Sequence, residues 1–222
     1  MATLAELRTR ILNKLDDGNV QHPTASQVDE QINLTIDYYE TEEFWFTEEI
    51  VTLTTTVGDG ILSGIPSDFK QLIMPNSLVV FQSQVPYPVK KITPLQFDSI
   101  FVGNSLGLPR WFTYRDGNIE LYYTPDQVYN VELFYRKTYA DLVNDNDQND
   151  FTTKTERLIE YKTLLDLLDD YRVDLERVAR YEAKVNDEYK KIKRESVNRI
   201  TTGELITENI VDRDRAYTYF GY

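Results

Sequence analysis

The sequence predicts an α+β protein in which an antiparallel β domain is inserted into a helical bundle and an extended C-terminal tail follows. Helical periodicity occupies both ends of the chain, strand formers and turn signals occupy its middle, and the residues from Thr201 onward show no clear period. The expected segments are an N-terminal helical hairpin (1–43), the β domain (44–140), two C-terminal helices (141–200) and the tail (201–222).

Two capped helices are expected at the start of the chain. Thr3 with Glu6 forms a capping-box pattern, and Thr24 with Gln27 repeats it. Apolar residues at helical spacing follow each box, namely Leu4, Leu7, Ile11 and Leu15, and then Val28, Ile32, Ile36 and Tyr39. We therefore expect a helical hairpin whose first helix ends near Asp16–Gly18.

The inserted β domain begins where the period changes, at Phe44–Phe46. Strands are expected over residues 50–57, 71–81 and 89–92, and a short helix over 95–101. Pro75 implies a bulge, an edge or a break in the second strand, and Thr93-Pro94 marks the start of the short helix.

Residues 109–135 predict an antiparallel β-meander. Trp111–Tyr114 and Ile119–Tyr123 are short runs of strand formers, and the Asp-Gly pair between them favours a tight hairpin turn. Thr124–Asp126 is a second turn signal, after which Val128–Tyr135 alternates as a strand packed on a core does. The three strands are therefore expected to lie side by side.

Two more helices and the tail complete the chain. Thr153 with Glu156 predicts a third capping box. Two apolar stripes follow, Leu158, Tyr161, Leu165 and Leu168 before a break at Asp169-Asp170, and Leu175, Val178, Val185, Tyr189 and Ile192 after it. The cations Lys190, Lys191, Lys193 and Arg194 are expected in the last turns, where they complement the helix dipole. The aromatic tail, 201–222, is expected to need a partner.

Composition limits the classes of protein that the chain can belong to. At 222 residues and 41% hydrophobic it can bury a core in one or two domains, and the absence of cysteine excludes disulfides, thiolate metal sites and cysteine nucleophiles. No apolar run approaches the ~20 residues of a membrane span, and Met1–Leu15 lacks a signal-peptide core, which favours a cytosolic origin. The net charge of −13 argues against a surface that binds nucleic acid by neutralising its phosphates.

The sequence predicts no enzyme, because no convergent catalytic site is visible. The single histidine, His22, precedes Pro23 in an expected turn, so a conventional triad has no other base. A glycosidase-like carboxylate pair remains an alternative, although pairs such as Asp16/Asp17, Glu42/Glu43, Glu48/Glu49 and Asp169/Asp170 are also what an acidic surface produces by chance. We expect no catalytic residue and no cofactor.

One acidic loop resembles the calcium loop of an EF-hand. Asp145, Asp147, Asn149 and Glu156 occupy its positions 1, 3, 5 and 12. Asp150 stands where the motif needs glycine, and the preceding segment reads as a strand rather than a helix. The expected structure is a solvated loop before a capped helix, no metal site is predicted, and calcium binding is left open.

Aromatic residues are abundant, with 16 tyrosines and 10 phenylalanines. Many should face the core of the β domain, and others are typical of protein–protein contacts. A carbohydrate- or protein-binding module with an aromatic β face is the alternative function. Its candidate residues are Trp45, Trp111, Tyr114 and Tyr122.

Several short motifs, taken in order, resemble the head-to-tail connector, or adaptor, proteins of tailed bacteriophages. They are Leu4–Arg8, the aromatic-acidic segment Tyr38–Glu49, Ile65–Phe69, Thr93–Asp98, Gly107–Phe112 and Gly117–Pro125, followed by a Leu-Phe-Tyr strand and a two-helix C-terminal part. Each motif alone is weak, whereas their order and spacing together are fairly specific and cover most of the chain.

This resemblance implies a structural virion protein at the head-to-tail junction, assembled in the host cytoplasm. Such adaptors typically form a dodecameric ring beneath the portal protein, extend the channel that DNA follows during genome ejection, and present a docking platform for tail or neck proteins. Their C-terminal segment commonly inserts between portal subunits. On this chain the portal-binding residues would be Glu204, Ile206, Ile210, Tyr217, Tyr219, Phe220 and Tyr222.

The acidic balance suggests how DNA could pass such a channel without specific binding. Carboxylates repel phosphates, and residues 1–43 hold nine acidic residues against three basic ones. The N-terminal helices are thus one candidate source of an acidic lumen, and an ordinary solvated face is the equal alternative. The sequence leaves open the tail morphology, the distal partner, the face that lines the channel, and whether a ring forms without the portal.

Overall fold

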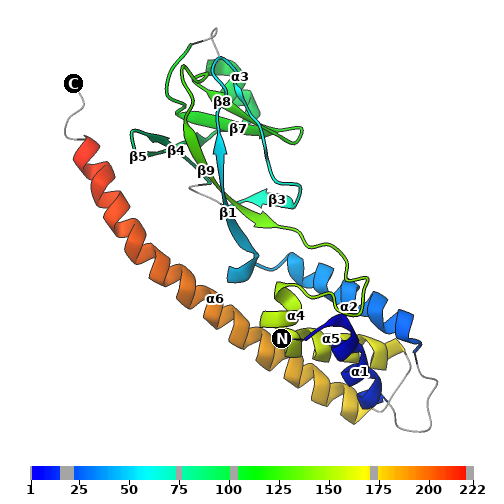
Figure 1. The fold of residues 1–222 in the computed structure, drawn as a ribbon. Coiled ribbons are helices and arrows are strands. Elements are labelled where there is room, and N and C mark those ends of the chain that lie inside the picture. Colours follow the sequence, from blue (N-terminus) through cyan, green and yellow to red (C-terminus); the bar gives the residue numbers. More distant parts are fainter. Residues whose placement is uncertain (1, 16–22, 74–76, 101–104, 171–174, 219–222) are drawn as a thin grey trace. The chain divides into compact units, whose positions relative to one another are not determined.

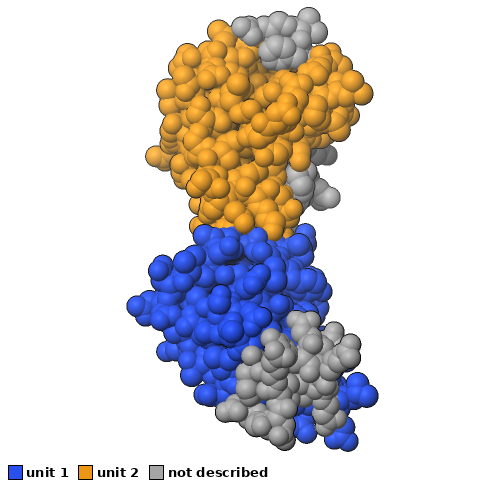
Figure 2. Space-filling view, turned by 90° about the vertical axis from the view of Figure 1, so that its right-hand side faces the viewer, with its two compact units in different colours: residues 1–47, 139–222 blue, residues 48–138 orange. Residues whose placement is uncertain are grey.

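The computed structural model describes residues 2–15, 23–73, 77–100, 105–170 and 175–218, with the backbone alone at 169–170 and 200–218. The chain divides into two compact units (Figure 2). Unit 1 consists of residues 1–47 and 139–222, and unit 2 of residues 48–138. Because each unit has its own hydrophobic cluster, each is described separately below.

Unit 1 is helical. Its elements are α1 (Leu4–Leu15), α2 (Ala25–Glu40), the 3₁₀ turn η1 (Trp45–Thr47), α4 (Asp150–Lys154), α5 (Glu156–Asp170) and α6 (Leu175–Thr218) (Figure 1). The core is formed by buried aliphatic side chains of α1, α2 and α5 together with the aromatic residues Phe44, Phe46 and Phe151. Phe151 lies 5.1 Å from Phe46 and 6.3 Å from Phe44 between ring centroids, so the short α4 joins the core through one aromatic side chain.

The first two predicted helices are confirmed together with their caps. In α1 the Thr3 hydroxyl accepts from the Glu6 amide at 3.3 Å while the Glu6 carboxylate accepts from the Thr3 amide at 3.2 Å. Thr24 and Gln27 form the same reciprocal pair at α2. All eight apolar residues of the two predicted stripes are buried. Local pattern was sufficient here because both caps and both stripes agree.

The third predicted capping box is wrong. The box forms instead between Asn149 and Thr152, at the start of α4, and Thr155 ends this helix before α5 begins at Glu156. Asparagine is a strong N-cap residue, and the Thr152 hydroxyl takes the reciprocal place that glutamate usually fills. Thr153 therefore lies inside a helix rather than before one.

The predicted extended tail is also wrong over the residues that the structure describes. α6 continues without interruption to Thr218, a length of 44 residues (Figure 1). No proline interrupts the segment, and the single Gly203 costs only about 1 kcal/mol of helix propensity. Lys190–Arg194 consequently lie within the helix and not at its end, so the expected dipole role fails. Leu175, predicted in the buried stripe, is 83% exposed.

Unit 2 contains two sheets. Strand order in the first is β1-β9-β4-β5 with β3 also paired to β9, and in the second β2-β8-β7-β6. The elements are β1 (Glu48–Thr54), β2 (Ile61–Leu62), β3 (Phe69–Leu72), β4 (Leu78–Gln82), β5 (Val85–Pro88), β6 (Lys90–Lys91), α3 (Pro94–Ile100), β7 (Trp111–Arg115), β8 (Asn118–Tyr122) and β9 (Asn130–Lys137). One buried cluster includes Leu53, Val80 and Leu133 of the first sheet and Phe112 and Leu121 of the second, so the two sheets share a core.

The meander prediction is correct for its first two strands and wrong for the third. β7 and β8 form the expected hairpin, with positive φ angles of 51° at Asp116 and 80° at Gly117. β9 instead lies in the other sheet, paired with β1 on one side and with β4 and β3 on the other. Backbone bonds from Thr124 to Ser105 and from Thr55 to Tyr129 hold the connecting chain away from β8.

The predicted strand at 71–81 is divided into β3 and β4, with residues 74–76 outside the described part of the chain. β5 was missed, since its two prolines are unusual in strands. It is an edge strand, where a missing amide donor is tolerated. The short helix is confirmed as α3, and Thr93 with Gln96 forms a capping box that was also missed.

Candidate functional site

The C-terminal half of α6 carries the residues expected to bind a partner. Glu204, Ile206, Ile210 and Tyr217 lie in the helical backbone of α6, whereas Tyr219, Phe220 and Tyr222 lie outside the described residues. An α-helix places residues four apart on one face, so Ile206 and Ile210 share a face of α6. The four candidate residues that the structure describes therefore lie on a helix and not on an extended segment.

A short cluster of contacts fixes α6 to the rest of unit 1 just before this half begins. The Ser196 hydroxyl, almost fully buried, donates to the Ile192 carbonyl at 3.0 Å and accepts from the Trp45 amide at 3.3 Å. One turn later the Arg199 guanidinium lies 3.4 Å from the centre of the Trp45 ring, and Lys154 of α4 lies 4.7 Å from it. Trp45 therefore joins α6 and α4 through cation–π contacts.

A second contact joins α6 to the end of α2. Glu42 accepts from the Lys193 ammonium at 2.6 Å and from the Tyr189 hydroxyl at 2.9 Å. The contact with Lys193 is the main reason why the pKa of Glu42 lies below its ordinary value of 4.5. Burial, reinforced by the bond to Glu42, raises the pKa of Tyr189 to about 12. Lys193 also lies 5.3 Å from the centre of the Phe44 ring.

These anchoring residues were only partly visible in the sequence. Tyr189 and Ile192 belong to the predicted stripe, and Ser196 and Arg199 continue it at helical spacing. Serine and arginine were not recognised as inward-facing because neither is apolar. The signal that could have found them is helical spacing, since Ser196 follows Ile192 by four residues and Arg199 follows Ser196 by three.

The acidic residues of the N-terminal helices are largely engaged within unit 1. Asp29 lies 2.7 Å from Arg8, and Glu42 is held by Lys193. The Glu40 carboxylate accepts from the Tyr139 amide at 2.7 Å. Asp16 and Asp17 lie outside the described residues. The nine acidic residues counted in the sequence therefore overstate the free negative charge of this face.

The other carboxylate pairs show no arrangement for acid–base chemistry in the described structure. Glu48 and Glu49, neighbours on β1, are separately paired with Arg136 at 3.5 Å and Lys137 at 3.3 Å. Side chains of Asp169 and Asp170, and the whole of His22, lie outside the described part of the chain. The residues that can be placed assemble neither the carboxylate pair left open as an alternative nor a triad based on His22.

The loop that resembles a calcium site is organised by its own side chains. Asp147 accepts from the backbone amides of Val143 and Asn144 at 2.9 and 2.7 Å, and these bonds lower its pKa. Asn149 caps α4, and Glu156 lies 3.7 Å from Arg10. Among the described residues no group of three or more histidines, cysteines or carboxylates is placed to hold a metal ion. The oxygens that the motif would need are committed elsewhere.

The four aromatic candidates for a carbohydrate face do not form one. Trp45 belongs to unit 1, where Arg199 covers its ring, and Tyr114 packs on Phe69 in the core of unit 2 with ring centroids 5.5 Å apart. Only Trp111 and Tyr122 are neighbours, at 5.8 Å. Tyr123, which the sequence reading did not single out, stacks on Tyr122 at 4.7 Å.

Two hollows mark the described surface of unit 2. One, of about 500 Å³, is lined by Trp111 and Tyr123 together with Leu106, Gly107, Leu108 and Arg110. The other, of about 530 Å³, lies over the first sheet and is lined by Thr52, Phe81, Ser83, Gln84, Val128, Asn130 and Glu132. Leu106 and Val128 are each more than 60% exposed, so the lining of each hollow includes one exposed apolar side chain.

Comparison with known proteins gives one family. A family model described as SU10 adaptor protein matches residues 2–206, which include all of unit 2 and most of unit 1. No curated protein matches the chain. Within the described residues, no helix combines the length and the apolar character needed to cross a membrane.

Proposed function

The chain belongs to the SU10 adaptor protein family, a family of phage adaptor proteins, and from this premise we propose that it forms a dodecameric ring beneath the portal protein. The ring extends the DNA channel and provides the platform on which tail components dock. The observation that carries this proposal is the family match over residues 2–206. Membership makes the protein a structural component of the virion that associates with portal and tail proteins.

We assign the contact with the portal to the C-terminal end of the chain. Residues 201–218 continue α6 beyond Ser196 and Arg199, both of which contact Trp45. The candidate contact residues are Glu204, Ile206, Ile210 and Tyr217 on α6, and Tyr219, Phe220 and Tyr222 after it. A helix of this kind can place two or three turns of apolar and aromatic side chains in a groove of its partner.

Truncation tests this assignment. A chain that ends at Ile200 keeps Ser196, Arg199 and Lys193, so unit 1 should remain folded with an unchanged far-UV signal per helical residue. It should no longer bind portal rings in a sedimentation assay. A matched variant, Tyr217→Ala with Phe220→Ala in the full-length chain, should weaken binding without removing the helix. Portal binding by the truncated chain at full strength would refute the assignment.

The docking platform for tail components is assigned to unit 2. The hollow is lined by Trp111, Tyr123 and Arg110, and tryptophan, tyrosine and arginine are enriched at protein–protein contacts. Trp111→Ala should reduce capture of tails by portal–adaptor complexes while leaving the portal contact intact. Leu95→Ala, at another exposed position of unit 2, serves as the control.

DNA passes the ring without specific binding in this proposal. The net charge of −13 per chain places about 156 negative charges on a ring of twelve copies, which disfavours adhesion of phosphates. Binding of the purified protein to duplex DNA at physiological salt should therefore be negligible. Salt-dependent retention on DNA would contradict this part of the proposal.

The first experiment is the mass of the purified protein, by native mass spectrometry, alone and mixed with portal protein. A ring, or a complex with the portal in fixed stoichiometry, is the expected result. A monomer that ignores the portal would overturn the proposed function.

A further inference from the structure

One edge of the first sheet of unit 2 is open. β1 pairs with β9 in continuous register over its whole length, and no other described strand lies beside it. The Thr55 amide donates to the Tyr129 carbonyl, so the odd-numbered residues of β1 face β9 and the even-numbered ones face away, because hydrogen-bonding direction alternates along an antiparallel strand. The backbone groups of Ile50, Thr52 and Thr54 therefore point to the open edge, and none has a hydrogen-bond partner among the described residues.

The other described edges of the two sheets are protected against strand pairing. β5, at the opposite edge of the same sheet, contains Pro86 and Pro88. The Val89 amide donates to the Leu78 carbonyl, so the odd-numbered residues of this strand face β4 and both prolines face outward, where an added strand would find no donor. β3 contains a register shift, and β2 and β6 have two residues each. β1, in contrast, has seven residues without proline, lysine or a bulge.

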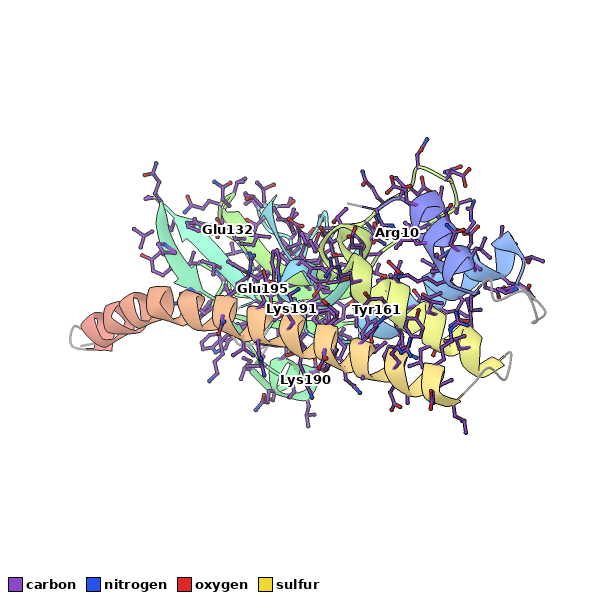
Figure 3. All side chains as sticks on the ribbon, turned by 90° about the horizontal axis from the view of Figure 1, so that it is seen from below. Arg10, Glu132, Tyr161, Lys190, Lys191 and Glu195 are labelled. Carbon is purple, nitrogen blue, oxygen red and sulfur yellow. The ribbon has the colours of Figure 1, made fainter. Side chains whose placement is uncertain are left out.

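The outer face of the same sheet offers side-chain contacts next to this edge. Ile50 is 56% exposed although it is large and apolar. Thr52 lines the hollow of about 530 Å³ together with Glu132 of β9, which is labelled in Figure 3. Glu132 makes no ion pair with a described residue, whereas the two glutamates of β1 are each paired with a cation of β9. A half-buried carboxylate without a cation favours a partner that brings one.

We propose that β1 accepts an extended segment of a tail protein as an additional strand, an inference that rests on the proposed docking of tail components on unit 2. The segment has no proline at the positions that donate to β1. On its inner face it carries apolar residues, which extend the core beside Val51 and Leu53. Backbone hydrogen bonds to β1 provide affinity, and the alternating side chains provide specificity.

The segment carries an arginine or a lysine on its outer face. Thr52 lies directly opposite Glu132 in the register of β1 and β9. Because neighbouring strands lie about 4.8 Å apart, the added strand lies about 10 Å from β9, and only the short side chain of Thr52 stands between them. An arginine and a glutamate side chain together span this distance. The ion pair fixes the register, since a slip by one residue would turn the cation to the other face.

A strand of a second copy is the other possible occupant, and the structure disfavours it. Copies in a ring join through two different surfaces, so β1 would have to pair with another edge of the next copy. The described alternatives are blocked by prolines, interrupted by a register shift or only two residues long. Pairing of β1 with β1 follows a twofold axis and ends after two copies. The edge therefore stays open in the ring.

Hydrogen exchange tests the strand pairing directly. In the portal–adaptor complex the amides of Ile50, Thr52 and Thr54 should exchange freely, because they have no acceptor. Capture of tails should slow exchange of these amides by about tenfold or more in the peptides that cover β1, measured by mass spectrometry. Peptides that cover β5, the edge blocked by prolines, are the matched control and should not change.

Two substitutions separate the backbone from the side-chain contribution. Thr52→Pro removes an outward amide at an edge position, where proline is tolerated, and Glu132→Arg reverses the charge without changing β1. Each should lower tail capture on the order of tenfold. Thr54→Val keeps the backbone donor and is the control that should capture tails normally. Thermal denaturation shows whether each variant is folded, and Glu132→Arg remains a test if Thr52→Pro is not.

The outcomes distinguish this inference from the proposed function. Tail capture without protection of β1 would overturn the inference and leave the proposed function standing. Failure of the unsubstituted complex to capture tails would overturn the proposed docking on unit 2 as well. Protection that is complete when the ring forms on the portal, before tails are added, would assign the edge to a second copy and overturn the inference.

Discussion

Replacing Lys193 with methionine should loosen the attachment of α6 to the end of α2. Methionine keeps most of the length of the side chain and its apolar stem but removes the ammonium group. The substitution therefore abolishes the 2.6 Å contact with Glu42 and the cation–π contacts with Phe44 and Tyr189. Glu42 keeps the hydrogen bond from the Tyr189 hydroxyl at 2.9 Å, so it is not left without a partner.

The expected loss follows from the exposure of the groups. The side chains of Lys193 and Glu42 are 31% and 28% exposed, so water screens the ion pair and its contribution is about 1 kcal/mol. The contacts with the two rings add about 0.5 kcal/mol. Lys193→Met should thus lower the free energy of unfolding of unit 1 by about 1.5 kcal/mol at pH 7. In a Glu42→Gln background the same change should cost less, with a coupling energy of about 0.5–1 kcal/mol.

The coupling should depend on pH with a definite sign. The folded chain holds the pKa of Glu42 below its ordinary value of 4.5, so its contribution is complete above 4.5 and disappears as the pH falls through the lower, folded value. The pKa of Tyr189 is shifted in the opposite direction, from 10.0 to about 12. Its contribution is complete below 10 and is lost as the pH rises from 10 toward 12. Tyr189→Phe should remove this alkaline loss and leave the acid one.

Tryptophan fluorescence can follow unit 1 alone. The chain has two tryptophans, Trp45 in unit 1 and Trp111 in unit 2, so a Trp111→Phe background leaves a reporter beside Arg199 and α6. Urea unfolding of the four variants of the cycle then gives the coupling energy. A coupling indistinguishable from zero at pH 7, or one that persists unchanged well below pH 4.5, would show that Lys193 and Glu42 do not act as a pair.

Three further tests, two of them with a matched control substitution, examine how each unit is built. Phe151→Ala should cost unit 1 about 3–5 kcal/mol in urea unfolding because this ring is fully buried, whereas Val143→Ala, 77% exposed, should cost less than about 0.5. Asn149→Ala should lower the stability of unit 1 by about 1 kcal/mol because Asn149 is the N-cap of α4, and Thr153→Ala should lower it clearly less. A larger loss for Thr153→Ala in thermal denaturation would instead support the capping box predicted from the sequence. Gly117→Ala should lower the stability of unit 2 by about 1 kcal/mol through its φ of 80°, and an unchanged melting temperature would argue against this turn.

The parts of the fold that sequence predicted are those that neighbouring residues decide. The caps at Thr3 and Thr24 and the two apolar stripes that follow need only contacts within a turn or two, and each is found as expected. The hairpin at Asp116-Gly117 is equally local, since two consecutive positive φ angles require such residues. The resemblance to phage adaptor proteins likewise rests on short motifs, and the family match confirms it.

The parts that sequence did not predict depend on distant partners. β9 alternates as any half-buried strand does, and nothing within Val128–Tyr135 says that β1 and β4, rather than β8, will pair with it. The predicted helix ended too early because polar residues occupy the inward positions of α6 after Ile192. Ser196 is buried there only because the Trp45 amide, far away in sequence, provides a donor for its hydroxyl. Burial of a polar side chain can be predicted only when its hydrogen-bond partner is known.

If the N-terminal helices line the channel, their carboxylates must be free of cations from their own chain. Several acidic residues of this segment, among them Asp29 and Glu42, are already paired within unit 1 and cannot fill that role. Leu34 and Tyr38 are exposed on α2, and a DNA channel gives no reason for apolar side chains on its wall. The lumen of the proposed ring must therefore draw much of its negative charge from other residues.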